Sequence, residues 1–88
     1  KGLYAPTPQV LRNVHIARKP PLEKLEETQE TIGKVAKLLK GRGRVFVRYS
    51  GTEPAIRVLV EGPKQGENRR LADLIVKTYL FETGQKEA

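Results

Sequence analysis

Two short runs of alternating residues, separated by only six residues, constrain the fold of this chain more than any other feature. Residues 44–48 alternate valines with larger side chains, and residues 55–61 alternate isoleucine or valine with other side chains. This period of two is typical of strands with one buried face. The segment 49–54 between them contains glycine and proline, as loops do. So short a connection joins antiparallel neighbours, and the sequence therefore predicts a β-hairpin.

A strand and a helix are expected before the hairpin. Residues 9–16 carry apolar side chains spaced for one face of a strand, and Pro20-Pro21 ends it. Residues from about 22 to 40 have the three- and four-residue apolar spacing of an amphipathic helix, with glutamates early and lysines late. Gly41 is its expected C-terminal cap. The predicted apolar stripe consists of Leu22, Leu25, Ile32, Val35, Ala36 and Leu39.

A second helix is expected after the hairpin, over roughly 66–82. Gly62-Pro63 ends the preceding strand, and Gly84 is expected to end the helix. The side chains predicted to be buried are Leu71, Leu74, Ile75, Thr78, Tyr79 and Phe81.

The order strand–helix–strand–strand–helix predicts the fold class. It implies an α+β fold, with an antiparallel sheet of three to four strands and two helices packed on one face. Eighty-eight residues are expected to form a single domain over 1–88. Residues 1–8 would lead into the fold, and residues 83–88 would form a frayed tail. Because the chain starts at Lys1 rather than at methionine, we expect a fragment of a longer protein.

Composition excludes several classes of site. The chain has no cysteine, so disulfides and thiolate metal sites are excluded. A single histidine, His15, leaves little scope for a histidine-based metal site or a catalytic triad. No apolar run reaches the ~18 residues that a membrane span needs. The formal net charge of +7 favours an anionic partner without saying which one.

The hairpin loop has the composition of an anion site. Gly51 lets a ligand approach the main chain closely, and Ser50 and Thr52 add hydroxyl donors. Arg48 and Arg57 flank the loop with guanidinium groups suited to bidentate contact with phosphate. If the valine faces of both strands meet the same core, the two arginines project together from the other side of the sheet.

The residues alone leave other interpretations open. Serine, glycine and threonine also form ordinary turns, and arginines are common on exposed sheet faces. The basic clusters Arg18-Lys19 and Arg42-Gly43-Arg44 could contact nucleic acid, and a small basic nucleic-acid-binding domain is the alternative function. These clusters lack the interleaved aromatic residues that stack on bases, which makes nucleic acid the less favoured partner.

The loop also resembles a known motif. The run Arg48-Tyr49-Ser50-Gly51-Thr52-Glu53-Pro54, followed by Arg57-Val58, is similar to the phosphate-binding loop of the α-D-phosphohexomutases. Its Gly-Thr-Glu-Pro form resembles the phosphoglucosamine mutase branch of that family. Ala55 and Leu59 depart conservatively from the family pattern. Further similar segments, in the same order, are Pro8–Leu11, Lys19–Leu22, Gly41–Val45 and Val60–Pro63.

The resemblance implies that the chain is the last of four domains of an isomerase. Such an enzyme moves phosphate between the 6- and 1-positions of a hexose through a bisphosphorylated sugar, here glucosamine 6-phosphate to glucosamine 1-phosphate. The implied phosphoserine, the Mg²⁺ bound by aspartates and the sugar-reading segment all belong to the other three domains. We therefore expect no catalytic residue and no metal site in this chain, and no activity from it alone. The expected compartment is the cytoplasm, with no membrane partner.

The resemblance also implies roles for single residues. Arg48, Ser50, Gly51, Thr52 and Arg57 would hold the phosphate that does not react.

Three neighbouring residues have less specific expectations. His15 is expected to be a half-exposed structural histidine, and Tyr49 to pack beside the loop. Glu53 is expected to order the loop or to pair with an arginine.

Overall fold

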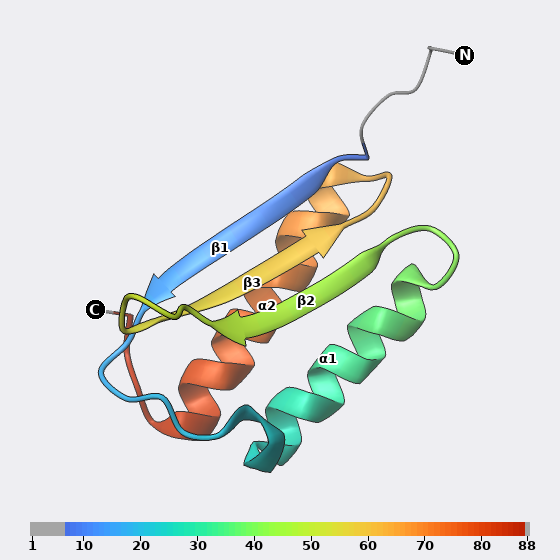
Figure 1. Cartoon of the computed structure of the whole chain (residues 1–88). Coiled ribbons are helices and arrows are strands. Elements are labelled where there is room, and N and C mark those ends of the chain that lie inside the picture. Colours follow the sequence, from blue (N-terminus) through green and yellow to red (C-terminus); the bar gives the residue numbers. More distant parts are fainter. Residues whose placement is uncertain (1–6, 88) are drawn as a thin grey trace.

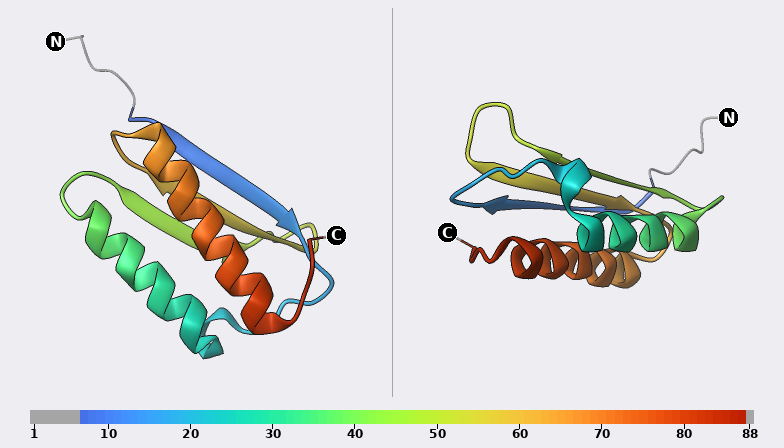
Figure 2. Two further views of the ribbon diagram at one scale, coloured as in Figure 1. Left: turned by 180° about the vertical axis from the view of Figure 1, so that it is seen from behind. Right: turned by 90° about the horizontal axis from the view of Figure 1, so that it is seen from below.

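The chain folds into an antiparallel sheet covered on one face by two helices (Figure 1). The structure is a computed structural model that describes residues 7–87. Its elements are β1 (Gln9–His15), the 3₁₀ turn η1 (Leu22–Lys24), α1 (Glu26–Leu39), β2 (Arg44–Tyr49), β3 (Ala55–Glu61) and α2 (Gln65–Thr83). The strand order is β1-β3-β2, and both helices lie on the same side of the sheet (Figure 2). The predicted α+β class is confirmed, with three strands.

The core lies between the sheet and the helices. β3 is the central strand, and its side chains Ile56, Val58 and Val60 are fully buried. Val14 of β1 lies opposite Ile56, and Val45 of β2 lies opposite Val60. The alternation seen in the sequence is therefore the division of the sheet into a core face and an open face. The helices contribute Val35, Leu39, Leu71, Ala72, Ile75, Val76 and Tyr79.

The first helix begins later than predicted. Leu22–Lys24 form a 3₁₀ turn, and Leu25 has extended dihedral angles (φ −93°, ψ 90°), so α1 starts at Glu26. Ala36, predicted to lie in the apolar stripe, is exposed, whereas Thr28 is fully buried. Since the 3₁₀ turn and Leu25 interrupt the helix, the residues before Glu26 do not belong to the same helical stripe.

The start of α1 is capped by a residue of α2. The carboxylate of Glu82 accepts hydrogen bonds from the backbone N–H groups of Thr28 (2.8 Å) and Glu27 (3.1 Å), and from the Thr28 hydroxyl (2.7 Å). Leu25, at the N-cap position, makes no side-chain cap of its own. A carboxylate also suits the positive end of the helix dipole.

The hydrogen bonds to Glu82 shift its ionisation. Partial desolvation acts to raise the pKa of Glu82, but the bonds donated by Thr28 and by the backbone of Glu27 and Glu26 outweigh it and hold the pKa below its usual value. A depressed carboxyl pKa stabilises the fold above the pKa of the unfolded state. That contribution is lost as the pH falls through the pKa of the folded state.

The buried side of α2 is rotated from the predicted one. Leu74 and Phe81 are 48% and 82% exposed, although both were predicted to be buried. Ala72 and Val76, which were not predicted, are buried in their place, together with Asn68 and Thr83. Leu74 and Phe81 are seven residues apart and share one stripe, which faces away from the sheet.

Both predicted glycine caps are present. Gly41 (φ 79°) follows α1 and Gly84 (φ 67°) follows α2, and both adopt the left-handed conformation that ends helices. Residues 1–6 of the predicted leading segment lie outside the described residues. In the segment 83–88, Thr83 still belongs to α2, and the Gln85 side chain bonds to the backbone of Ala17 and Arg18. No helix within residues 7–87 is long and apolar enough to cross a membrane.

We predict that Gly33→Ala stabilises the domain by about 1 kcal/mol. Gly33 lies in the middle of α1 on an exposed position, and an added Cβ would meet no atom within 4 Å. The substitution therefore lowers the entropy of the unfolded chain and adds no clash. Urea unfolding gives the free-energy difference. Ala36→Gly, on an exposed position of the same helix, is the matched control and should lose a similar amount. Equal stability of Gly33→Ala and the wild type would contradict the prediction.

Candidate functional site

The β2–β3 loop is closed by a small network centred on Ser50. The Ser50 N–H donates to the Ala55 carbonyl (2.8 Å), which joins the two ends of the loop. The Ser50 hydroxyl oxygen accepts from the N–H groups of Thr52 and Glu53, both at 3.3 Å. This is the geometry of a serine turn. Two of the loop amides therefore point toward Ser50. The N–H of Gly51 makes no hydrogen bond within residues 7–87.

The two predicted arginines are direct neighbours across the sheet. Arg48 of β2 and Arg57 of β3 are register partners, and both are exposed. Their strand neighbours Val47 and Val58 face the helices, so the arginines project from the open face, as the alternation predicted. Neither guanidinium has an ion pair or hydrogen bond within residues 7–87.

This arrangement is unfavourable for the fold taken alone. Like charges directly opposite each other on one face of an antiparallel pair destabilise it, by roughly 0.2–1 kcal/mol. An anion placed between Arg48 and Arg57 would remove the repulsion and receive two planar sets of N–H donors.

The arginines line one end of a groove on the open face. The groove has a volume of about 420 Å³ and is lined by Gln9, Leu11, Phe46, Arg48, Arg57 and Leu59. The β2–β3 loop arches away from the helices, on the same side of the sheet as the groove (right view of Figure 2). The five residues predicted for the site thus lie at one end of the open face. Arg48 and Arg57 stand at the base of the loop that carries Ser50, Gly51 and Thr52.

The strand beneath the loop is held from the core side. Tyr49 packs edge-on against Tyr79, with ring centroids 6.2 Å apart and hydroxyl oxygens 3.0 Å apart. The Tyr49 hydroxyl also donates to the Pro20 carbonyl. Burial, with the hydrogen bond to Tyr79, raises the pKa of Tyr49 well above its usual value. Tyr49 is therefore a neutral anchor that fixes the end of β2.

Two contacts to the loop were not predicted from sequence. Lys19 donates from its Nζ to the Ser50 carbonyl (2.8 Å). Glu53 lies 3.5 Å from the Nε2 of His15, so its partner is this half-exposed histidine and not an arginine. Lys19 lies 31 residues from Ser50 in the chain. No local pattern connects them, and only the tertiary fold brings them together.

Within the described part of the chain, no group of three or more histidine, aspartate or glutamate side chains could hold a metal ion. Several of the charged side chains there form ion pairs instead. Arg12, for example, pairs with both Asp73 and Glu87.

A protein-family comparison covers the whole site. The model described as phosphoglucomutase/phosphomannomutase, C-terminal domain, matches residues 11–78. This match runs from β1 into α2 and includes the loop and both arginines. The chain belongs to this family. The resemblance noted in the sequence is confirmed.

Individual members of the phosphoglucomutase/phosphomannomutase family support this placement. The phosphoglucosamine mutase of Citrifermentans bemidjiense is 47% identical over 79 residues, which covers 90% of this chain and 17% of that protein. The phosphoglucosamine mutase of Protochlamydia amoebophila is 43% identical, with 88% of this chain and 17% of that protein covered. This chain therefore corresponds to one C-terminal domain, about a sixth of these curated relatives by length.

A solved structure of the same superfamily has the same fold. N-acetylphosphoglucosamine mutase of Aspergillus fumigatus, in complex with GlcNAc-6P and magnesium, superposes with a TM-score of 0.68. It is 28% identical, and the match covers 86% of this chain and 17% of that one. These relatives are mutases, and this chain has the fold of the C-terminal domain of their family.

Proposed function

We propose that this domain binds the phosphate group of a phosphosugar for a phosphoglucosamine mutase. The observation that carries the proposal is the opposed pair Arg48 and Arg57, which have no partner within residues 7–87 and stand at the base of the serine-centred loop. The two guanidinium groups would clamp the phosphate oxygens. The hydroxyl groups of Ser50 and Thr52 and the N–H of Gly51 would complete the set of donors.

The proposed parent reaction converts glucosamine 6-phosphate to glucosamine 1-phosphate through a bisphosphorylated sugar. The names of the bacterial relatives support the substrate class, and the Aspergillus enzyme was solved with a phosphorylated amino sugar. The domain would hold the phosphate that does not react, which orients the sugar for transfer at its other end. Closure over the substrate would exclude water from the site.

Catalysis itself is assigned to the other three domains of the parent enzyme. They would supply the phosphoserine, the Mg²⁺ site and the residues that read the sugar hydroxyls. The single domain formed by residues 1–88 would then have no mutase activity by itself. Because its substrates are phosphorylated, we place the parent enzyme in the cytoplasm.

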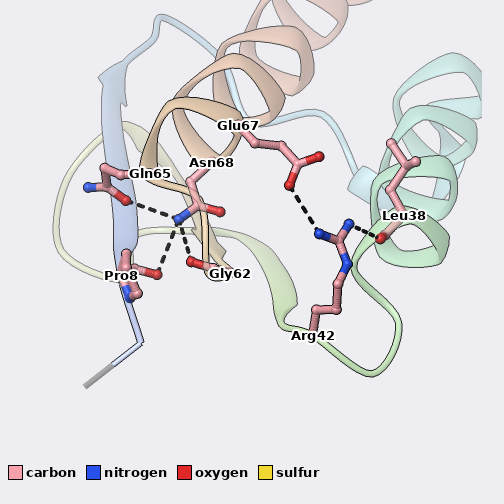
Figure 3. Close-up of polar contacts among 7 residues, drawn as sticks. All are labelled: Pro8, Leu38, Arg42, Gly62, Gln65, Glu67 and Asn68. Carbon is pink, nitrogen blue, oxygen red and sulfur yellow. Dashed lines mark hydrogen bonds and ion pairs between the residues drawn. The ribbon is translucent and has the colours of Figure 1, made fainter. Parts of the chain in front are cut away.

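The nucleic-acid alternative is not favoured by the geometry of the basic clusters. Arg42 donates to the Leu38 carbonyl and lies 3.5 Å from Glu67 (Figure 3). Arg18 donates to the Thr83 carbonyl. Both arginines are therefore engaged within the domain and do not form a free basic stripe of the kind that tracks a phosphate backbone.

An NMR titration of the domain with glucosamine 6-phosphate tests the proposal. We expect amide shifts confined to the loop and to the ends of β2 and β3, with millimolar affinity and a similar response to inorganic phosphate. A short oligonucleotide at the same salt concentration is the comparison ligand. Shifts around Arg18 and Arg42 with the oligonucleotide, and none in the loop with the sugar phosphate, would overturn the proposal.

A further inference from the structure

The connector between β1 and η1 contacts the β2–β3 loop at both of its ends. The backbone N–H of Ile16 donates to the Pro54 carbonyl at 2.8 Å. The ammonium group of Lys19 donates to the Ser50 carbonyl, also at 2.8 Å. These contacts hold the last and first residues of the loop against one segment of chain. In Figure 1 this segment runs from the end of β1 toward η1 and α1.

The connector is itself fixed by the end of the chain. The side-chain oxygen of Gln85 accepts from the N–H groups of Ala17 (2.9 Å) and Arg18 (2.8 Å). The amide nitrogen of Gln85 donates to the Arg18 carbonyl and to the Tyr79 hydroxyl, each at 3.2 Å. Tyr79 is fully buried. Lys19 therefore reaches the loop from a backbone that is tied to the core.

Ser50 is the residue through which Lys19 would act. The Ser50 N–H closes the loop, and its hydroxyl oxygen receives the N–H groups of Thr52 and Glu53. Its carbonyl is the remaining backbone group, and Lys19 holds it. The Ser50 carbonyl and the Gly51 N–H belong to the same planar peptide group, so holding the carbonyl also fixes the direction of the Gly51 N–H, one of the donors proposed for the phosphate. The ammonium group also offsets the negative end of a carbonyl dipole beside the anion site and adds a positive charge there.

We propose that Lys19 is a positioning residue for the phosphate loop, acting through the Ser50 carbonyl. This inference rests on the proposed function, since it needs the loop to bind phosphate. Lys19 is exposed, so its effect is modest: Lys19→Met should weaken binding of inorganic phosphate by about two- to fivefold. Lys19→Arg keeps both the charge and a donor and should bind phosphate within about a factor of two of the wild type.

The matched control is Lys77→Met. Lys77 is exposed on α2, and its side chain makes no hydrogen bond or ion pair within residues 7–87, so the variant removes the same charge away from the loop. Inorganic phosphate is titrated into all four proteins at one ionic strength, and the Kd is taken from loop amide shifts. The ligand-free amide shifts of Ser50, Gly51 and Thr52 are recorded as well. Lys19→Met alone should change both readouts, and Lys19→Arg should restore both.

The outcomes separate the two proposals. If the wild type shows no phosphate-dependent shift in the loop, the proposed function is wrong, and the inference about Lys19 fails with it. If the wild type binds but Lys19→Met matches Lys77→Met in Kd, only the inference about Lys19 is overturned. Failure of Lys19→Arg to restore binding would also overturn it, because a retained donor and charge would then be insufficient.

Discussion

Replacing Arg48 or Arg57 by glutamine is expected to weaken phosphate binding about tenfold or more while making the domain more stable. Each guanidinium would contribute charge-assisted hydrogen bonds, which are worth roughly 1.5–3 kcal/mol. The same substitution removes a like-charge contact between register partners, so the free energy of unfolding without ligand should rise by roughly 0.2–1 kcal/mol. Opposite signs for binding and stability are the signature of a binding residue.

Phosphate is also expected to raise the free energy of unfolding of the wild type. Because the repulsion is relieved only when an anion is bound, phosphate should stabilise the wild type more than either variant. At ten times Kd, linkage gives about 1.4 kcal/mol. Phosphate also stabilises proteins in general, as a salt. This effect is the same for wild type and variant, so it drops out when their phosphate-dependent changes in unfolding free energy are subtracted.

Urea unfolding with and without phosphate, at low ionic strength, measures these effects. Arg69→Gln is the matched control, because Arg69 is exposed on α2 and makes no hydrogen bond or ion pair within residues 7–87. It should change neither phosphate affinity nor phosphate-dependent stability. An Arg48→Gln protein that is less stable than the wild type and binds phosphate equally well would show that the arginine has a structural role.

Asn68→Asp is expected to destabilise the domain by about 3–5 kcal/mol. Asn68 is fully buried at the start of α2, at the opposite end of the sheet from the loop. Its side-chain nitrogen donates to the carbonyls of Gly62 (3.0 Å) and Pro8 (3.2 Å) and to the side-chain oxygen of Gln65 (3.0 Å), as Figure 3 shows. Aspartate has almost the same shape, but it offers no N–H. It would place a buried negative charge against three oxygen atoms.

Two variants separate the causes of this loss. Asn68→Leu removes the donors without adding charge and should be less damaging than Asn68→Asp. Asn13→Asp makes the same chemical change on an exposed position of β1, opposite Arg57, and should cost little or stabilise slightly. Urea unfolding at neutral pH compares the three. Equal stability of Asn68→Asp and the wild type would show that the amide donors do not hold β1, β3 and α2 together.

The sequence by itself determined the hairpin and the side of the sheet from which each of its residues projects. A period of two has only two faces, and a short loop leaves one way to pair the strands. The valines therefore faced the helices, and Arg48 and Arg57 had to lie together on the open face. The loop motif was sufficient to indicate the family, which the match over residues 11–78 confirmed. The predicted roles of the five site residues stay predictions.

Only the tertiary structure decided where α1 begins and which side of α2 is buried. The cap of α1 comes from Glu82, more than fifty residues away, so no local pattern could locate Glu26 as the first residue. Leu74 and Phe81 are as hydrophobic as their buried neighbours, and the angle at which α2 packs on the sheet leaves them exposed. Lys19 and Gln85 reach the loop and its connector across the fold. Local sequence specifies the periodicity of each helix or strand and, in a strand, the face on which each side chain lies. Contacts between distant segments depend instead on how the helices pack on the sheet.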